Sequence, residues 1–189
     1  MLRDREASIP KVFDHLHAEA REKGLTNFHI WTRYSIENYL LEPEFVVGAI
    51  NQEASDRRKP APDEQTILNA LTESCDRVFD SARAAFISAA EAAYQRYSLV
   101  LVNQREAAIK DALAYLDGCR DLVDKINVLP GYKIFSQFVQ TLQNRFGLSI
   151  RFESLIERID RQNAPAELLS FFDKLEALSA QRESSRSVS

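Results

Sequence analysis

The chain has 189 residues, and its 24 Lys+Arg against 28 Asp+Glu give a formal net charge of -4. The hydrophobic content of 45% is that of an ordinary globular domain, and the 5 glycines argue against Gly-rich phosphate loops and many-stranded sheets. No run approaches the roughly 18 apolar residues of a membrane span, and the charged N-terminus does not resemble a signal peptide. We therefore predict a mainly helical, cytoplasmic protein that does not contact the membrane.

The N-terminal third predicts a small α/β segment over residues 1–54. Pro10 suits the first turn of a helix that carries Val12 and Leu16 and ends near Gly24. Residues 27–32 form an aromatic and β-branched run that predicts a strand. Strand, helix and strand in succession are typical of a parallel sheet, although this sequence offers one complete strand.

The middle of the chain predicts a long helical hairpin over residues 63–118. It follows a second short helix from Pro43 to about Ile50 and a charged, proline-containing loop at 55–62. Apolar residues then recur at helical spacing over 63–97 and again over 99–116. Two readings remain open: the pair is an ordinary part of a helical bundle, or it is an arm with its own function in assembly.

The last third predicts a helical part over residues 128–178, followed by a polar, Ser-rich tail at 179–189 that we expect to be disordered. The first helix here follows the Pro-Gly pair at 130–131 and ends at Gly147. Residues 151–159 and 165–178 predict two more helices, with Glu167 near the positive end of the second. Cys75 and Cys119 lie in helical patterns, so we expect packing residues and no disulfide.

Three acids are candidate metal ligands. Asp4 and Glu6 are separated by one residue, so both would point to the same side at the end of a strand, where parallel sheets bind ligands. Glu37 follows the predicted second strand among aromatic and aliphatic residues. Carboxylates in such a place can hold a hard divalent cation. The alternatives are that the first two acids are solvated loop residues, and that Glu37 or Asn38 caps the turn.

Lys133 is the candidate anion-binding residue. It comes next to Gly131 at the start of a predicted helix, where backbone N–H groups and a lysine together favour a phosphate. The alternative is a loop lysine in water. The chain has no Walker A motif, so ATP hydrolysis by that mechanism is excluded.

Several segments together resemble the C-terminal Toprim region of the OLD-family nucleases and related ABC-type ATPase–Toprim defence proteins. They are LRDRE, FHIWTRYSIENYLLEP, LPGYKIFSQFVQTLQNRFG and APAELLSFFDKL, of which ENYLLEP is the most specific. The resemblance implies that residues 1–54 are a partial Toprim-like segment. It also implies that Asp4 and Glu6, with Glu37 as a further ligand, hold Mg²⁺ or Mn²⁺, and that Lys133 is the catalytic lysine.

The leading hypothesis is therefore the C-terminal fragment of a Toprim-type, Mg²⁺-dependent DNA endonuclease. DNA and an ATPase domain or subunit are the expected partners. Because the family's upstream strand with its catalytic glutamate does not precede Met1, we expect the chain to be inactive alone. The alternative is a non-catalytic helical module for dimerisation or protein interaction, in which the hairpin at 63–118 joins two copies.

Overall fold

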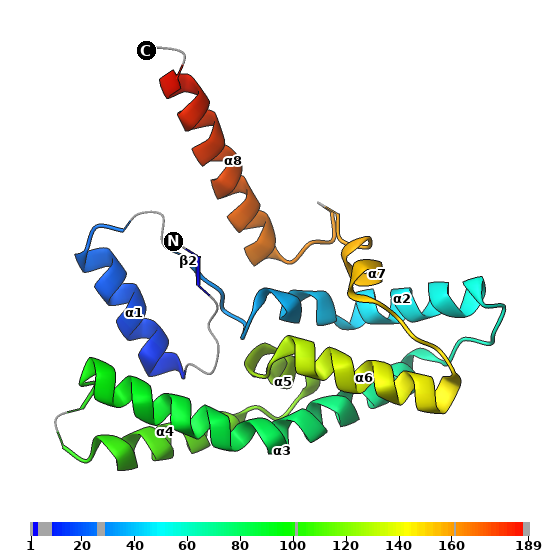
Figure 1. Cartoon of the computed structure of the whole chain (residues 1–189), viewed down its shortest axis with the longest axis horizontal. Coiled ribbons are helices and arrows are strands. Elements are labelled where there is room, and N and C mark those ends of the chain that lie inside the picture. The colour runs from blue at the N-terminus through cyan, green and yellow to red at the C-terminus, as the bar shows by residue number, and fades with distance from the viewer. Residues whose placement is uncertain (1, 4–8, 26–28, 101, 161, 187–189) are drawn as a thin grey trace.

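The computed structural model describes residues 2–3, 9–25, 29–100, 102–160 and 162–186. Helices form most of this part, which confirms the prediction of a mainly α protein (Figure 1). The strands are β1 (Leu2–Arg3) and β2 (His29–Ile30). The helices, in chain order, are α1 (Pro10–Glu22), the 3-10 helix η1 (Ile36–Leu41), α2 (Pro43–Asp56), α3 (Glu64–Tyr97), α4 (Gln104–Gly118), α5 (Leu122–Val128), α6 (Gly131–Phe146), α7 (Phe152–Ile156) and α8 (Ala166–Arg186).

The two strands pair in parallel. Leu2 lies opposite His29 and Arg3 opposite Ile30, and α1 lies between the strands in the chain. α1 begins at Pro10, as predicted, and the chain turns at Gly24 with a φ of +66°. Each strand contributes two described residues to the ladder, and residues 27–28 of the predicted strand lie outside the described part. In the described part of the chain, the parallel pair is therefore a small feature of a mainly helical structure.

α3 is the central element and contributes to two clusters of buried side chains. Its first half packs with α2, α5 and α6, and the buried residues that it supplies there include Ile67, Leu71 and Cys75. Its second half packs with α1 and α4 and supplies Phe86 and Tyr94 to the second cluster. Figure 1 shows α3 running along the molecule with α4 beside it. Burial of these apolar side chains supplies most of the stabilisation of the fold.

α3 and α4 form the predicted hairpin, in which small residues make the contact. Ala90, Ala108 and Ala112 are each 0–1% exposed, which lets the two helices approach closely. α4 begins at Gln104 and not near the predicted Leu99. The reason is that Ser98 and Asn103 both adopt the left-handed conformation, so the chain reverses between them.

Other boundaries also differ from those predicted. α2 continues to Asp56, past the predicted end at Ile50, and α8 continues to Arg186, past the predicted boundary at 178. The predicted helix at 151–159 is shorter, since α7 covers Phe152–Ile156. α5 has seven residues, too few to produce a recognisable helical period, and was not predicted.

Two further sequence expectations concern the cysteines and the membrane. Cys75 and Cys119 are both buried and are not joined in a disulfide, as predicted. Burial raises the pKa of the Cys75 thiol to about 12. Within the described residues, no helix has the length and apolar character needed to cross a membrane.

Candidate functional site

The predicted site residues lie at the segments that follow the strands and at the start of α6. β1 ends at Arg3, and Asp4 and Glu6 lie outside the described residues. Glu37 is in the first turn of η1, and Lys133 is in the first turn of α6. η1 packs against α6, so these last two residues belong to neighbouring elements.

Asn38 supplies the cap in η1, which was one of the alternatives for this segment. The backbone N–H and the hydroxyl of Ser35 donate hydrogen bonds to Asn38 Oδ1 at 2.9 and 2.8 Å. Asn38 is 0% exposed, so both of its polar side-chain atoms need partners inside the protein. Glu37 is partly exposed, and within the described residues it forms no hydrogen bond or ion pair. Its carboxylate is therefore available to a ligand.

The other end of the Asn38 amide reaches across to the junction between α5 and α6. Nδ2 donates to the carbonyl oxygen of Ile126 and, at 2.8 Å, to that of Leu129. These bonds satisfy carbonyl groups near the end of α5, which have no partner within the helix. Gly131 lies directly against Asn38: a Cβ there would be 3.0 Å from the Asn38 backbone nitrogen. The ENYLLEP and LPGYK segments, far apart in the sequence, are thus in contact.

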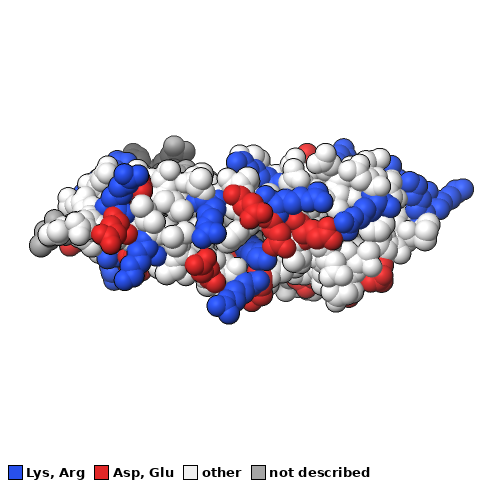
Figure 2. Space-filling model, turned by 90° about the horizontal axis from the view of Figure 1, so that it is seen from below, with Lys and Arg blue, Asp and Glu red and all other residues white. Residues whose placement is uncertain are grey.

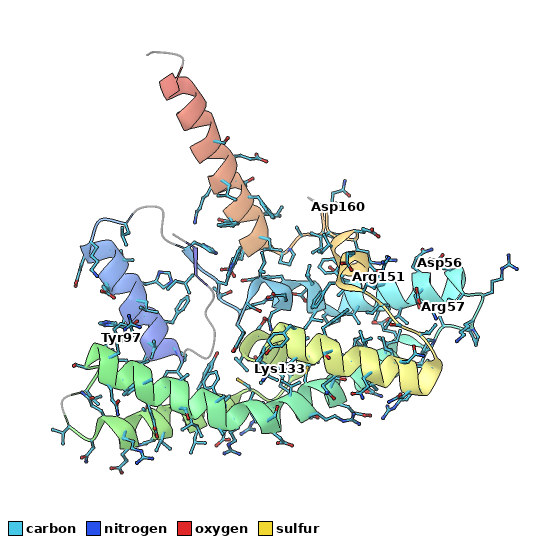
Figure 3. All side chains as sticks on the ribbon, viewed as in Figure 1. Asp56, Arg57, Tyr97, Lys133, Arg151 and Asp160 are labelled. Carbon is cyan, nitrogen blue, oxygen red and sulfur yellow. The ribbon has the colours of Figure 1, made fainter. Side chains whose placement is uncertain are left out.

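Lys133 is exposed at the beginning of α6, as Figure 3 shows. Its backbone N–H donates to the Pro130 carbonyl at 3.0 Å, so this N–H is not free to bind an anion. The side chain borders a small cavity of about 80 Å³ together with Tyr34. In the part of the chain that the structure describes, no hydrogen bond or ion pair joins Lys133 to Glu37. The ammonium group can meet an anion only at the surface.

The described residues do not by themselves form a metal centre. No group of three or more His, Cys, Asp or Glu side chains converges among them. Glu37 is the one predicted metal ligand that the structure describes, since Asp4 and Glu6 lie outside it. A Mg²⁺ ion bound by one carboxylate would depend on water and further oxygen ligands.

A cluster around Glu167 is the feature that sequence reasoning missed. The Glu167 carboxylate, in the first turn of α8, accepts from the backbone N–H of Thr32 at 3.0 Å, and also from the hydroxyl groups of Thr32 and Tyr39. His29 Nε2 lies 3.4 Å from Oε1 of the same carboxylate. The sequence signal was an acid at a helix N-terminus, which says nothing about partners more than a hundred residues away.

Burial and the carboxylate change the acidity of two members of the cluster. Burial, reinforced by the hydrogen bond to Glu167, raises the pKa of the Tyr39 phenol well above its usual range. Burial lowers the pKa of His29, while Glu167 opposes this effect. Trp31 packs edge-on against His29 and Tyr39 and is 1% exposed. The contacts of this cluster therefore hold the N-terminal end of α8 against β2 and η1.

Arg33, which follows β2, is engaged in three contacts. Its guanidinium donates to the Asn38 carbonyl at 3.1 Å, pairs with Glu42 and lies 4.5 Å from the centre of the Tyr39 ring. The charge of Arg33 is thus compensated by Glu42. This arrangement is structural, and among the described residues the Lys133 side chain forms no ion pair.

The chain matches no protein-family model, no curated protein and no solved structure.

Proposed function

We propose that this chain is the C-terminal part of a Toprim-type, Mg²⁺-dependent DNA endonuclease that works with an ATPase. The observation that supports this most is the parallel pairing of β1 with β2 across α1. In open parallel sheets, ligands bind beyond the carboxyl ends of the strands. Asp4 directly follows β1, and Glu37 follows β2 in a turn that Asn38 holds in place.

In this proposal the three acids hold the metal, and Lys133 contributes positive charge. Asp4, Glu6 and Glu37 supply carboxylate oxygens, the ligands that Mg²⁺ prefers in proteins. When bound there, a metal ion would polarise the phosphate and lower the pKa of its water. The Lys133 ammonium stabilises the negative charge that develops on the phosphate oxygens. The contact between Asn38 and Gly131 favours this division of roles, because it fixes η1 against the start of α6.

In the part of the chain that the structure describes, β1 and β2 have two residues each, and a parallel sheet is normally larger and covered on both faces. We therefore propose that another segment or subunit supplies further strands and the ATPase. The chain alone should cleave DNA poorly or not at all.

We propose that the DNA contacts the strand end of the molecule and not the hairpin face. Figure 2 shows basic and acidic side chains interspersed over the face seen from below. Several are paired in the region of α3 and α4, including Arg105 with Glu91 at 3.2 Å. Such a face lacks the continuous positive charge that attracts a phosphate backbone.

A Mn²⁺ titration of the full chain, followed by calorimetry, tests the proposed metal site. We expect binding by the wild type and loss of at least about tenfold in affinity in Asp4→Asn, because one carboxylate ligand is neutralised. Asp14→Asn, on the exposed face of α1, is the matched control and should bind like the wild type. Equal binding by Asp4→Asn, Glu37→Gln and the wild type would contradict the metal site.

Plasmid DNA incubated with the same chain and Mg²⁺ tests the second half of the proposal. We expect no cleavage above that of the Asp4→Asn variant. Robust cleavage by the chain alone would show that no further strand or ATPase is needed.

A second candidate function is self-association through the hairpin, which a specific feature of α4 favours. Its outer face forms an open groove of about 690 Å³ bordered by Ile109 and Leu113, and Val102 nearby is 74% exposed. Apolar residues in such a groove are typical of helix-binding surfaces. Light scattering after size exclusion distinguishes a dimer from a monomer. The wild type should be a dimer, and Leu113→Glu should be a monomer. A monomeric wild type would exclude this candidate.

A further inference from the structure

A cavity of about 490 Å³ lies beside the connection between β2 and η1, and neither Glu37 nor Lys133 lines it. Three segments form its walls: the connection itself, the end of α4, and α5. The residues used here are Thr32, Arg33, Tyr115, Cys119, Asp124 and Asn127. The backbone N–H of Tyr34 donates to the Asn127 carbonyl at 2.7 Å, which ties α5 to the connection. The volume is that of a small-molecule site.

α5 presents two oxygen acceptors to this region. Asn127 Oδ1 is buried and has no hydrogen-bond partner among the described residues. Asp124 lies three residues earlier, on the same side of the helix. Its backbone N–H donates to Asp121 Oδ1 at 2.8 Å, but its carboxylate has no partner within the described part of the chain. A buried acceptor without a donor is costly and indicates a missing partner, such as a water, an ion or a ligand.

The charges around the cavity leave Asp124 uncompensated. Arg33 borders the cavity, but it pairs with Glu42 and donates to the Asn38 carbonyl. Lys125, the neighbour of Asp124, reaches Asp76 at 2.5 Å on a different side of α5. Because Glu42 compensates the charge of Arg33, the Asp124 carboxylate and the Asn127 oxygen favour a ligand that is cationic and donates hydrogen bonds.

We propose that this cavity binds a small organic cation of the amidinium or guanidinium class, joined to an apolar body. The planar cation would donate to Asp124 and to Asn127 Oδ1, and the apolar body would lie against Tyr115 and Val128. The cavity is too large for a single metal ion, and one carboxylate with one amide oxygen is a sparse metal site. The proposal is independent of the nuclease proposal, since neither acceptor belongs to that metal site.

Benzamidine is a suitable probe, and benzamide is its uncharged counterpart of nearly the same shape. Titrated into the full ¹⁵N-labelled chain, benzamidine should shift the backbone amides of residues 32–33, 115–119 and 124–128. We expect a dissociation constant of about 1 mM, a usual value for so small a ligand. Benzamide should bind at least about tenfold more weakly, because it lacks the charge. Shifts elsewhere, no shifts at all, or equal binding of benzamide would overturn the proposal.

Two variants and a control complete the test. Asp124→Asn should weaken benzamidine binding about tenfold through loss of the charged acceptor. Asn127→Asp adds a negative charge at the other acceptor and should tighten benzamidine binding severalfold. Misfolding could weaken binding but would not tighten it, so this variant distinguishes the two causes. Asp117→Asn, on the last turn of α4 but outside the cavity wall, should bind like the wild type. Unchanged affinity in both cavity variants would also overturn the proposal.

Discussion

Asn38 and Gly131 meet so closely that a Cβ atom on Gly131 would lie 3.0 Å from both the backbone nitrogen and Oδ1 of Asn38. The contact joins η1 to the start of α6 and leaves no space for a side chain. Because Asn38 is fully buried and hydrogen-bonded on both sides, it cannot move aside without breaking those bonds. The position of Lys133 relative to Glu37 thus depends on a glycine two residues before the lysine.

Gly131→Ala tests this contact. We expect the added methyl group to force η1 and α6 apart and to lower the free energy of unfolding by about 1–3 kcal/mol. Gly118→Ala is the matched control, because a Cβ at Gly118 would meet nothing within 4 Å and Gly118 is the last residue of α4. There we expect no loss, or a gain of about 0.5 kcal/mol, from reduced freedom of the unfolded chain. Urea denaturation measures both; equal stability of the two variants would contradict the packing argument.

Asn38→Asp tests the hydrogen bonds and predicts a pH dependence. An ionised carboxylate can accept from Ser35 but would face the carbonyl oxygens of Ile126 and Leu129. Its pKa in the folded state should therefore be raised above the unfolded value of about 3.9. The variant should be closest to the wild type below that pH and lose about 3 kcal/mol as the pH rises towards 7.

The exposed Asn69→Asp serves as the control for this pH dependence. Asn69 lies on the surface of α3, where its side chain accepts from Gln65 at 3.0 Å. The stability of this control should follow that of the wild type between pH 4 and pH 7. If the stability of Asn38→Asp also followed that of the wild type over this pH range, the hydrogen bonds donated by Asn38 Nδ2 would not contribute to stability.

Local sequence predicted one half of the Asn38 environment and not the other. The sequence left open that Glu37 or Asn38 caps the turn, and the structure shows that Asn38 forms the cap with Ser35. The bonds to Ile126 and Leu129 depend on how α5 packs against η1, and no local pattern encodes that. The same holds for Glu167: its place at a helix N-terminus was foreseeable, but its partners Thr32 and Tyr39 were not.

The helices were predictable to different degrees for physical reasons. α3 and α6 have long apolar stripes, with Asp63 as a cap before α3 and Gly147 after α6, and both match the prediction. α5 is shorter than two helical periods. Of the site residues, Asp4 and Glu6 lie outside the described part, so the metal site itself stays a prediction.

Glu167→Gln tests how α8 is held. The amide keeps the size of the side chain but weakens the charge-assisted bonds from Thr32 and Tyr39, at a cost of about 1–2 kcal/mol. We expect faster amide hydrogen exchange in residues 166–175, with little change in α6. Asp173→Asn, an exposed acid on the same helix, is the control and should leave exchange unchanged. Unaltered exchange in Glu167→Gln would mean that apolar contacts alone hold α8.

Two buried tyrosines predict a loss of stability at alkaline pH. Burial and a hydrogen bond to a carboxylate raise the pKa of Tyr39, beside Glu167, and of Tyr94, beside Asp111. Because the folded-state pKa exceeds the unfolded value of about 10, the stabilisation is complete below that pH and is lost as the pH rises further. In Tyr39→Phe, the free energy of unfolding measured by urea titration should therefore fall less steeply between pH 10 and pH 11 than in the wild type.

Tyr94→Phe should behave in the same way, and the effects of the two substitutions should add, because the residues lie in different clusters. An alkaline slope that stays at the wild-type value in both variants would contradict the assignment.

The course of α3 through both clusters of buried side chains has a consequence for how the protein melts. Leu71, in the first cluster, and Tyr94, in the second, both belong to this one continuous helix. Neither cluster can come apart while the other keeps all of α3 ordered, because the freed half of the helix would lose the packing that maintains it. The two clusters should therefore unfold as one cooperative unit, and a substitution that destabilises either cluster should lower the stability of both.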